Sequence, residues 1–110
     1  KDVERPTVVV YVDGSLFFGS QDQLTKTVQQ LVSEKVKHII FSLRGVPNID
    51  HSSIEEFVEI QQLLKEKQIA LWFCGLQAPV QSMMQRLGFI ETIGEENIYP
   101  SAVLALEALR

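Results

Sequence analysis

The residues of this 110-residue chain that could do chemistry are concentrated in one short run, Asp50-His51-Ser52-Ser53. Aspartate and serine lead the residue types that accept hydrogen bonds from free backbone N–H groups at the first turn of a helix. Each serine is followed three residues later by a glutamate, which is the spacing of a capping box. The two pairs are Ser52–Glu55 and Ser53–Glu56. The run therefore predicts the start of a helix.

The same run offers a second interpretation, a phosphorylation switch. A phosphate on Ser52 or Ser53 would add about −1.5 to −2 charges at neutral pH, and the free amides of a helix N-terminus would stabilise it. Nothing else in the sequence requires this modification. We therefore favour capping and keep phosphorylation as a hypothesis. His51 is expected to be an exposed loop residue, because no acid or nucleophile is evidently paired with it.

The other reactive residue types are scattered along the chain. A zinc site needs about four Cys, His or acidic ligands at short spacings, whereas His38, His51 and Cys74 lie far apart. Cys74 falls in an apolar run, which is typical of a buried thiol and not of a nucleophile. The glycines match no phosphate-binding loop. We predict no metal site, no cofactor and no enzymatic activity.

Composition narrows the class of protein further. Hydrophobic residues make up 45% and charged residues 22% of the chain, which is typical of one globular domain and not of a disordered chain. The net charge of −4 argues against nucleic acid as a partner. The longest apolar stretch, 69–76, is shorter than the roughly 18 residues that cross a bilayer, so we expect no membrane insertion by this chain. Lys1–Pro6 is expected to be a linker tail before a domain at 7–110, within a longer protein, since the chain does not begin with methionine.

Strands and helices are predicted to alternate. Short β-branched or apolar runs indicate strands, and apolar spacings of three and four indicate helices. This order predicts an α/β fold, a small mixed and mainly parallel sheet flanked by helices. The strands are expected at 7–12, 16–18, 38–43 and 69–74. The helices are expected after an N-cap at Ser20, from residue 54, over 79–87 and after an N-cap at Ser101. The last helix is expected to turn Ala102, Leu106 and Leu109 toward the core.

The helix that follows the polar run has two distinct sides. Its apolar side is wide and is predicted to pack on the sheet, while an acidic side follows a spacing of i, i+4, i+7 and i+11. This second side is expected to face solvent and offers a contact for a basic partner surface. Its residues are Glu55, Glu59, Gln62 and Glu66. Ligands and switches in open sheets lie at the carboxyl ends of strands, where the loop 44–53 is expected.

Three segments carry a family resemblance. "GVPNIDHSSIEEF", Gly45–Phe57, resembles the signature of STAS domains, the regulatory modules shared by SulP-type anion transporters and bacterial anti-sigma factor antagonists. "VVVYVDGSLFFGS", Val8–Ser20, and "LGFIETIGEENIYPSAVLALEAL", Leu87–Leu109, are similar to the opening and closing segments of the transporter version. The resemblance covers nearly the whole chain and favours the transporter branch.

The resemblance implies a regulatory domain on the cytoplasmic side of the membrane, which contacts the membrane domain of the same polypeptide and other cytosolic proteins. In the antagonist branch, the residue after the aspartate is a serine that a kinase phosphorylates. Asp50 matches that aspartate, but the next residue is His51, so the usual phosphate acceptor is missing. An antagonist-type partner-switching protein and a nucleotide-binding α/β module remain the alternatives.

Overall fold

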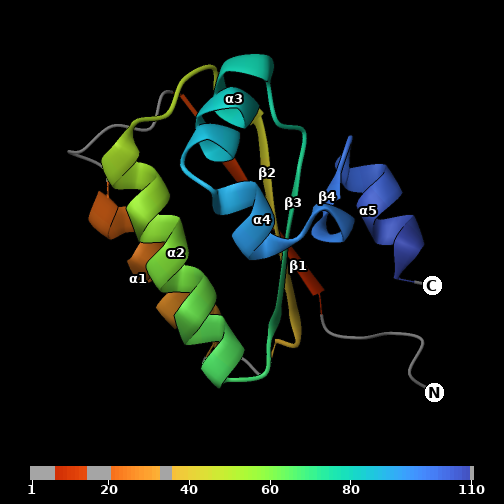
Figure 1. The fold of residues 1–110 in the computed structure, drawn as a ribbon. Coiled ribbons are helices and arrows are strands. Elements are labelled where there is room, and N and C mark those ends of the chain that lie inside the picture. Colours follow the sequence, from red (N-terminus) through yellow and green to blue (C-terminus); the bar gives the residue numbers. More distant parts are fainter. Residues whose placement is uncertain (1–6, 15–20, 33–35, 110) are drawn as a thin grey trace.

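A computed structural model describes residues 7–14, 21–32 and 36–109. Three expected features lie outside these residues: the linker tail at 1–6, the strand at 16–18 and the helix cap at Ser20. The described elements alternate along the chain as the sequence predicts (Figure 1). In order they are β1 (Thr7–Asp13), α1 (Gln21–Val32), β2 (His38–Gly45), α2 (His51–Glu66), β3 (Ala70–Cys74), α3 (Ala78–Arg86), α4 (Phe89–Ile93), the 3₁₀ turn η2 (Glu95–Asn97), β4 (Ile98–Tyr99) and α5 (Ala102–Ala108).

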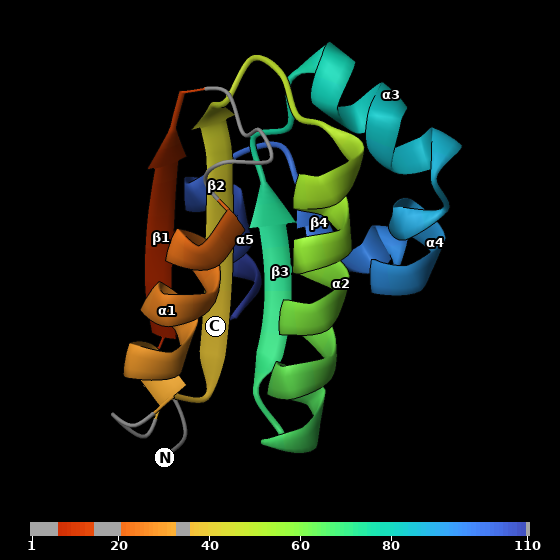
Figure 2. The same ribbon diagram turned by 90° about the vertical axis from the view of Figure 1, so that its left-hand side faces the viewer.

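The described strands form one sheet in the order β1-β2-β3-β4, and every pair of neighbours is parallel. β2 lies inside the sheet and is buried from His38 to Leu43, as its apolar run predicts. Helices α1 and α2 lie side by side on one face, while α5 covers the other face (Figure 2). This confirms the α/β architecture. Because the strands are parallel, the carboxyl ends of β1, β2 and β3 lie at the same end of the sheet.

The larger core lies between the sheet and the helices α1 to α4. Four phenylalanines from separate elements meet there, with 5.1 Å between the ring centroids of Phe57 and Phe73. Burying each ring fully stabilises the fold by about 1.5–3 kcal/mol, so these contacts fix α2 and α4 on the sheet. The four are Phe41 on β2, Phe57 on α2, Phe73 on β3 and Phe89 on α4.

The smaller core lies under α5, where Ala105 packs on Ile40 and Cys74. The prediction of which α5 residues face the core is partly wrong. Ala102 and Leu109 do pack against this core, but Leu106 is 40% exposed. The short helix presents the small Ala105 to the sheet, and this turns Leu106 outward.

The helix expected over 79–87 is α3, and the cap expected at Ser101 is observed. Pro79 lies in the first turn of α3, and Gly88 ends that segment with a φ of 77° that suits glycine. Ser101 caps α5 by accepting a hydrogen bond from the Leu104 N–H at 3.2 Å. Neither the short helix α4 nor the two-residue strand β4 is predicted by the sequence patterns.

Candidate functional site

The polar run Asp50–Ser53 lies at the start of α2, at the end of the sheet where the carboxyl ends of the strands meet. Asp50 is the N-cap: its carboxylate accepts a hydrogen bond from the Ser53 N–H at 2.9 Å, and its carbonyl accepts one from the Ile54 N–H at 3.2 Å. The extended backbone of Asp50, with φ −107° and ψ 175°, is the usual conformation of such a cap. The predicted capping role therefore belongs to Asp50, and the helix begins before both serines.

The two serines have different surroundings. Ser53 is only 1% exposed, and its hydroxyl has no hydrogen-bond partner among the described residues. Ser52 is half-buried and lies one residue nearer the helix start. A kinase requires an accessible hydroxyl, so the phosphorylation hypothesis narrows to Ser52.

The predicted capping boxes are wrong, and Glu56 shows why. Because Asp50 starts the helix, Glu56 falls on the buried side of α2, with 5% of its surface exposed. Its carboxylate accepts hydrogen bonds from the Thr25 hydroxyl at 2.7 Å and from the Thr25 N–H at 3.1 Å. Glu56 therefore links α2 to α1 and does not reach back to its own helix start.

His51 is exposed as expected, but it is the first residue of α2 and not a loop residue. It also has an acidic neighbour that we did not expect from the sequence. Its Nδ1 lies 3.4 Å from a carboxylate oxygen of Glu55, and both side chains are more than 60% exposed. A spacing of four residues on a helix brings such side chains together, so the signal was present in the sequence. An exposed pair of this kind stabilises a helix by less than about 1 kcal/mol, which leaves His51 available to a partner.

The predicted acidic side of α2 is a continuous exposed surface, which we call the acidic edge. All of its members are exposed and follow the helix from its first turn to its last. His51 and Ser52 lie at the helix start beside the acidic edge, so polar and charged side chains extend along the exposed side of α2. Its members are Glu55, Glu59, Gln62 and Glu66.

The other reactive groups lie away from the start of α2. Cys74 is fully buried on β3, and burial raises the pKa of its thiol more than a hydrogen bond with Ser42 lowers it. Such a thiol is protonated at neutral pH and is a poor nucleophile. His38 lies at the opposite end of β2 from the loop that precedes α2. Within the described ranges, no three His, Cys, Asp or Glu residues are grouped to hold a metal ion.

A small hollow of about 160 Å³ lies at the strand ends on the α5 side. Gly75 forms part of its wall with a φ of +70°, and an added Cβ would lie 3.1–3.3 Å from Arg44. The carbonyl of Arg44 accepts a hydrogen bond of 2.7 Å from the side chain of Gln77. Among the described residues, its wall carries the hydroxyl side chains of Tyr11, Ser42 and Ser101 and the side chain of Arg44.

The family model for the STAS domain matches residues 1–105. The chain belongs to the STAS domain family. This agrees with the placement of Gly45–Phe57 as the end of β2, the connecting loop and the start of α2. It also agrees with the parallel sheet and the helix that starts at the strand ends.

Sulfate transporters are among the known relatives of this STAS domain. It is 24% identical over 112 residues to sulfate transporter 3.2 of Arabidopsis thaliana and 23% identical over 103 residues to high affinity sulfate transporter 1 of Stylosanthes hamata. These matches cover 92% and 84% of this chain but only 17% and 15% of those proteins. No helix in the described part of this chain is long and apolar enough to cross a bilayer.

Solved structures give the same family. A sulfate transporter family protein from Wolinella succinogenes superposes with a TM-score of 0.87 at 28% identity, covering 99% of this chain and 88% of that one. The SulP transporter STAS domain from Vibrio cholerae superposes with a TM-score of 0.80 at 25% identity, covering 96% and 81%. The anti-sigma factor antagonist SpoIIAA, at 18% identity and a TM-score of 0.79, shares the fold.

Proposed function

We propose that this STAS domain is the cytoplasmic regulatory domain of a SulP-family anion transporter and that it acts through protein–protein contacts. The observation that carries the proposal is the likeness along 99% of the chain to the Wolinella succinogenes sulfate transporter family protein. The partner is the membrane domain of the same polypeptide, with other cytosolic proteins as further partners. The share of 15–17% that this chain spans in the curated transporters fits a regulatory module of a larger protein.

The contact surface in this proposal is the start of α2 and the acidic edge. Exposed carboxylates over the whole length of α2 suit a basic partner surface, because opposite charges steer association and fix its orientation. The buried side of α2 is held by the sheet and by the Thr25–Glu56 hydrogen bonds, so the exposed side is presented on a rigid element.

The test is a triple charge reversal in the full-length parent transporter, Glu55→Lys with Glu59→Lys and Glu66→Lys. Crosslinking between this domain and the membrane domain is expected to fall, and anion uptake is expected to change with it. The matched control makes the same change in charge on exposed carboxylates outside α2. It combines Glu91→Lys, Glu95→Lys and Glu107→Lys.

The control variant is expected to keep the crosslinks and the uptake of the unaltered transporter. Equal loss in both triple variants would mean that net charge matters and not the acidic edge. Unchanged crosslinking in the α2 variant would remove this surface from the proposal. A parent polypeptide without membrane-spanning segments would overturn the proposed function as a whole.

A further inference from the structure

Strand β3 has an edge that its neighbour covers only in part. On one side, β2 pairs with every residue of β3 from Ala70 to Cys74. On the other side, β4 pairs only with Phe73 and Cys74. Among the described residues, 70–72 therefore have no strand beside them on the β4 side, because the chain before β4 is the turn η2.

The direction of the backbone groups along β3 follows from two hydrogen bonds. The Ala70 N–H donates to the carbonyl of Lys37 at 3.1 Å, on the β2 side, and the Gly75 N–H donates to the carbonyl of Tyr99 at 3.1 Å, on the β4 side. Backbone groups alternate between the two edges along a strand. The N–H and C=O of Leu71 therefore point to the β4 side, where β4 does not reach.

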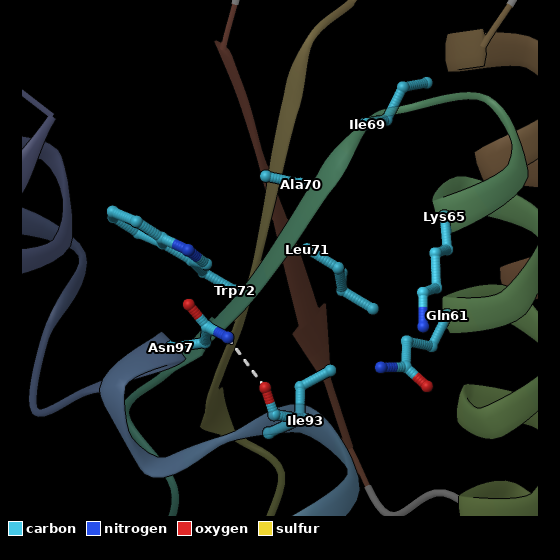
Figure 3. Close-up of a pocket in the computed structure, with 8 residues that line it drawn as sticks. All are labelled: Gln61, Lys65, Ile69, Ala70, Leu71, Trp72, Ile93 and Asn97. Carbon is cyan, nitrogen blue, oxygen red and sulfur yellow. Dashed lines mark hydrogen bonds between the residues drawn. The ribbon is translucent and has the colours of Figure 1, made fainter.

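A hollow of about 190 Å³ lies along this open edge, between β3, α2 and α4 (Figure 3). Its apolar wall is formed by the buried side chains of Ile69, Leu71 and Ile93. Figure 3 shows Gln61 and Lys65 facing Leu71 from α2, and Asn97 on η2 donating its amide to the carbonyl of Ile93 at 2.7 Å. The hollow thus combines one free strand edge, an apolar wall and a polar rim.

The rim carries one positive charge without a local counter-charge. Lys65 is exposed, and no carboxylate of the described residues lies within salt-bridge distance of its Nζ. A carboxylate on an incoming segment is attracted locally by this lysine, although the chain as a whole carries a net charge of −4. An incoming segment with a carboxylate would meet Lys65 while its backbone lies along β3.

We propose that the open edge at Ala70–Trp72 is a docking site for an extended peptide segment of a partner protein, carrying an acidic residue beside an aliphatic one. The segment adds a short strand to the sheet by hydrogen bonding to the N–H and C=O of Leu71, as in β-strand addition. Its aliphatic side chain packs on Ile69 and Ile93, and its carboxylate pairs with Lys65. This site is separate from the acidic edge and does not depend on the proposed function.

The probe is the synthetic peptide acetyl-Thr-Val-Thr-Val-Asp-Val-amide, titrated into the ¹⁵N-labelled chain and followed by amide chemical shifts. Shifts are expected at Leu71, Lys65 and Ile93, and the hydrogen exchange of the Leu71 amide is expected to slow. Without peptide, the Leu71 amide should exchange faster than that of Trp72, whose N–H faces β2. A second peptide with asparagine in place of the aspartate isolates the charge.

Lys65→Gln is expected to weaken binding of the aspartate peptide by about twofold to fivefold, the range of an exposed ion pair. It should leave the affinity for the asparagine peptide unchanged. Lys26→Gln, on the exposed side of α1, is the matched control and should leave both affinities unchanged. Equal weakening for both peptides in Lys65→Gln would contradict the assigned carboxylate contact.

Three results would overturn the proposal. The first is the absence of any chemical shift change at about 5 mM peptide, because even a weak site with a millimolar Kd for the peptide would be mostly occupied at that concentration. The second is a set of shifts confined to another surface, such as α5 or the start of α2. The third is protection of the Leu71 amide that rises with protein concentration in the absence of peptide, since a second copy of the chain would then occupy the edge.

Discussion

We predict that the half-buried contact between Thr25 and Glu56 contributes measurably to the stability of this STAS domain. Thr25→Val removes the hydroxyl that donates to the Glu56 carboxylate at 2.7 Å, while it keeps a side chain of similar shape. Glu56→Gln keeps the shape of the acidic side chain but removes its charge. The two substitutions and their combination form a double-mutant cycle across the α1–α2 contact.

The expected magnitudes follow from the two hydrogen bonds. A hydrogen bond to a charged group contributes about 1.5–3 kcal/mol, so Thr25→Val should lower the free energy of unfolding by that amount. Charge-assisted bonds are roughly twice as strong as neutral ones, so Glu56→Gln should lose about half of each of its two bonds to Thr25, or about 1.5–3 kcal/mol in total. In the Glu56→Gln background, Thr25→Val should cost only about 0.5–1.5 kcal/mol.

The assay is urea unfolding of the four proteins, followed by circular dichroism. The difference between the two costs of Thr25→Val gives a coupling energy of about 1 kcal/mol or more. Thr92→Val is the control, since Thr92 is exposed and its hydroxyl donates to the nearby Gly88 carbonyl at the start of α4, and it should change stability by less than about 0.5 kcal/mol. A cost of Thr25→Val as small as that of the control, or a coupling energy near zero, would refute the assigned role of Glu56.

Three further outcomes are expected. Asp50→Ala should lower the free energy of unfolding by about 1 kcal/mol through loss of the α2 cap, measured by urea unfolding. Because burial raises the pKa of the Cys74 thiol, the folded state holds its proton more tightly. Stability should therefore fall as pH rises above the thiol's ordinary value of 9.0, and Cys74→Ala should remove this slope. A kinase that modifies the folded domain should phosphorylate Ser52 and spare Ser53, as tryptic mass spectrometry would show.

The elements that the sequence predicts well are those with a strong local pattern. β2 was recognisable because the run from His38 to Leu43 is apolar on both faces, and such a strand requires cover on both sides. The end of α3 lies close to the expected residue 87, because Gly88 follows it with a φ of 77°, a left-handed conformation that favours glycine. In each case the physical cause lies within a few residues of the signal, so no tertiary information is needed.

Features that depend on distant contacts were not predictable. The two-residue strand β4 has no periodicity of its own and exists because β3 pairs with it. The bond between Thr25 and Glu56 joins residues 31 positions apart. A signal for it was nevertheless present: Glu56 lies four residues before the inward Ile60, so a helix starting at Asp50 turns it toward the core.

The candidate site shows the same division between local and distant causes. The acidic edge could be predicted, since a spacing of three and four residues sets one side of a helix wherever that helix packs. The open edge at Ala70–Trp72 could not, because it depends on how early the chain turns at η2 before β4 begins. A one-residue difference in that turn would change which β3 backbone groups are covered.

The two sides of α2 separate the stability of this domain from its contacts. Glu56 and Glu55 are neighbours in sequence, yet one is bonded to α1 within the fold and the other is exposed to solvent. Substitutions along the acidic edge therefore change surface charge with little loss of packing, because exposed positions usually shift stability by less than about 0.5 kcal/mol. A loss of partner binding in an acidic-edge variant with unchanged urea unfolding can then be assigned to the contact itself, whereas any change at Glu56 alters folding first.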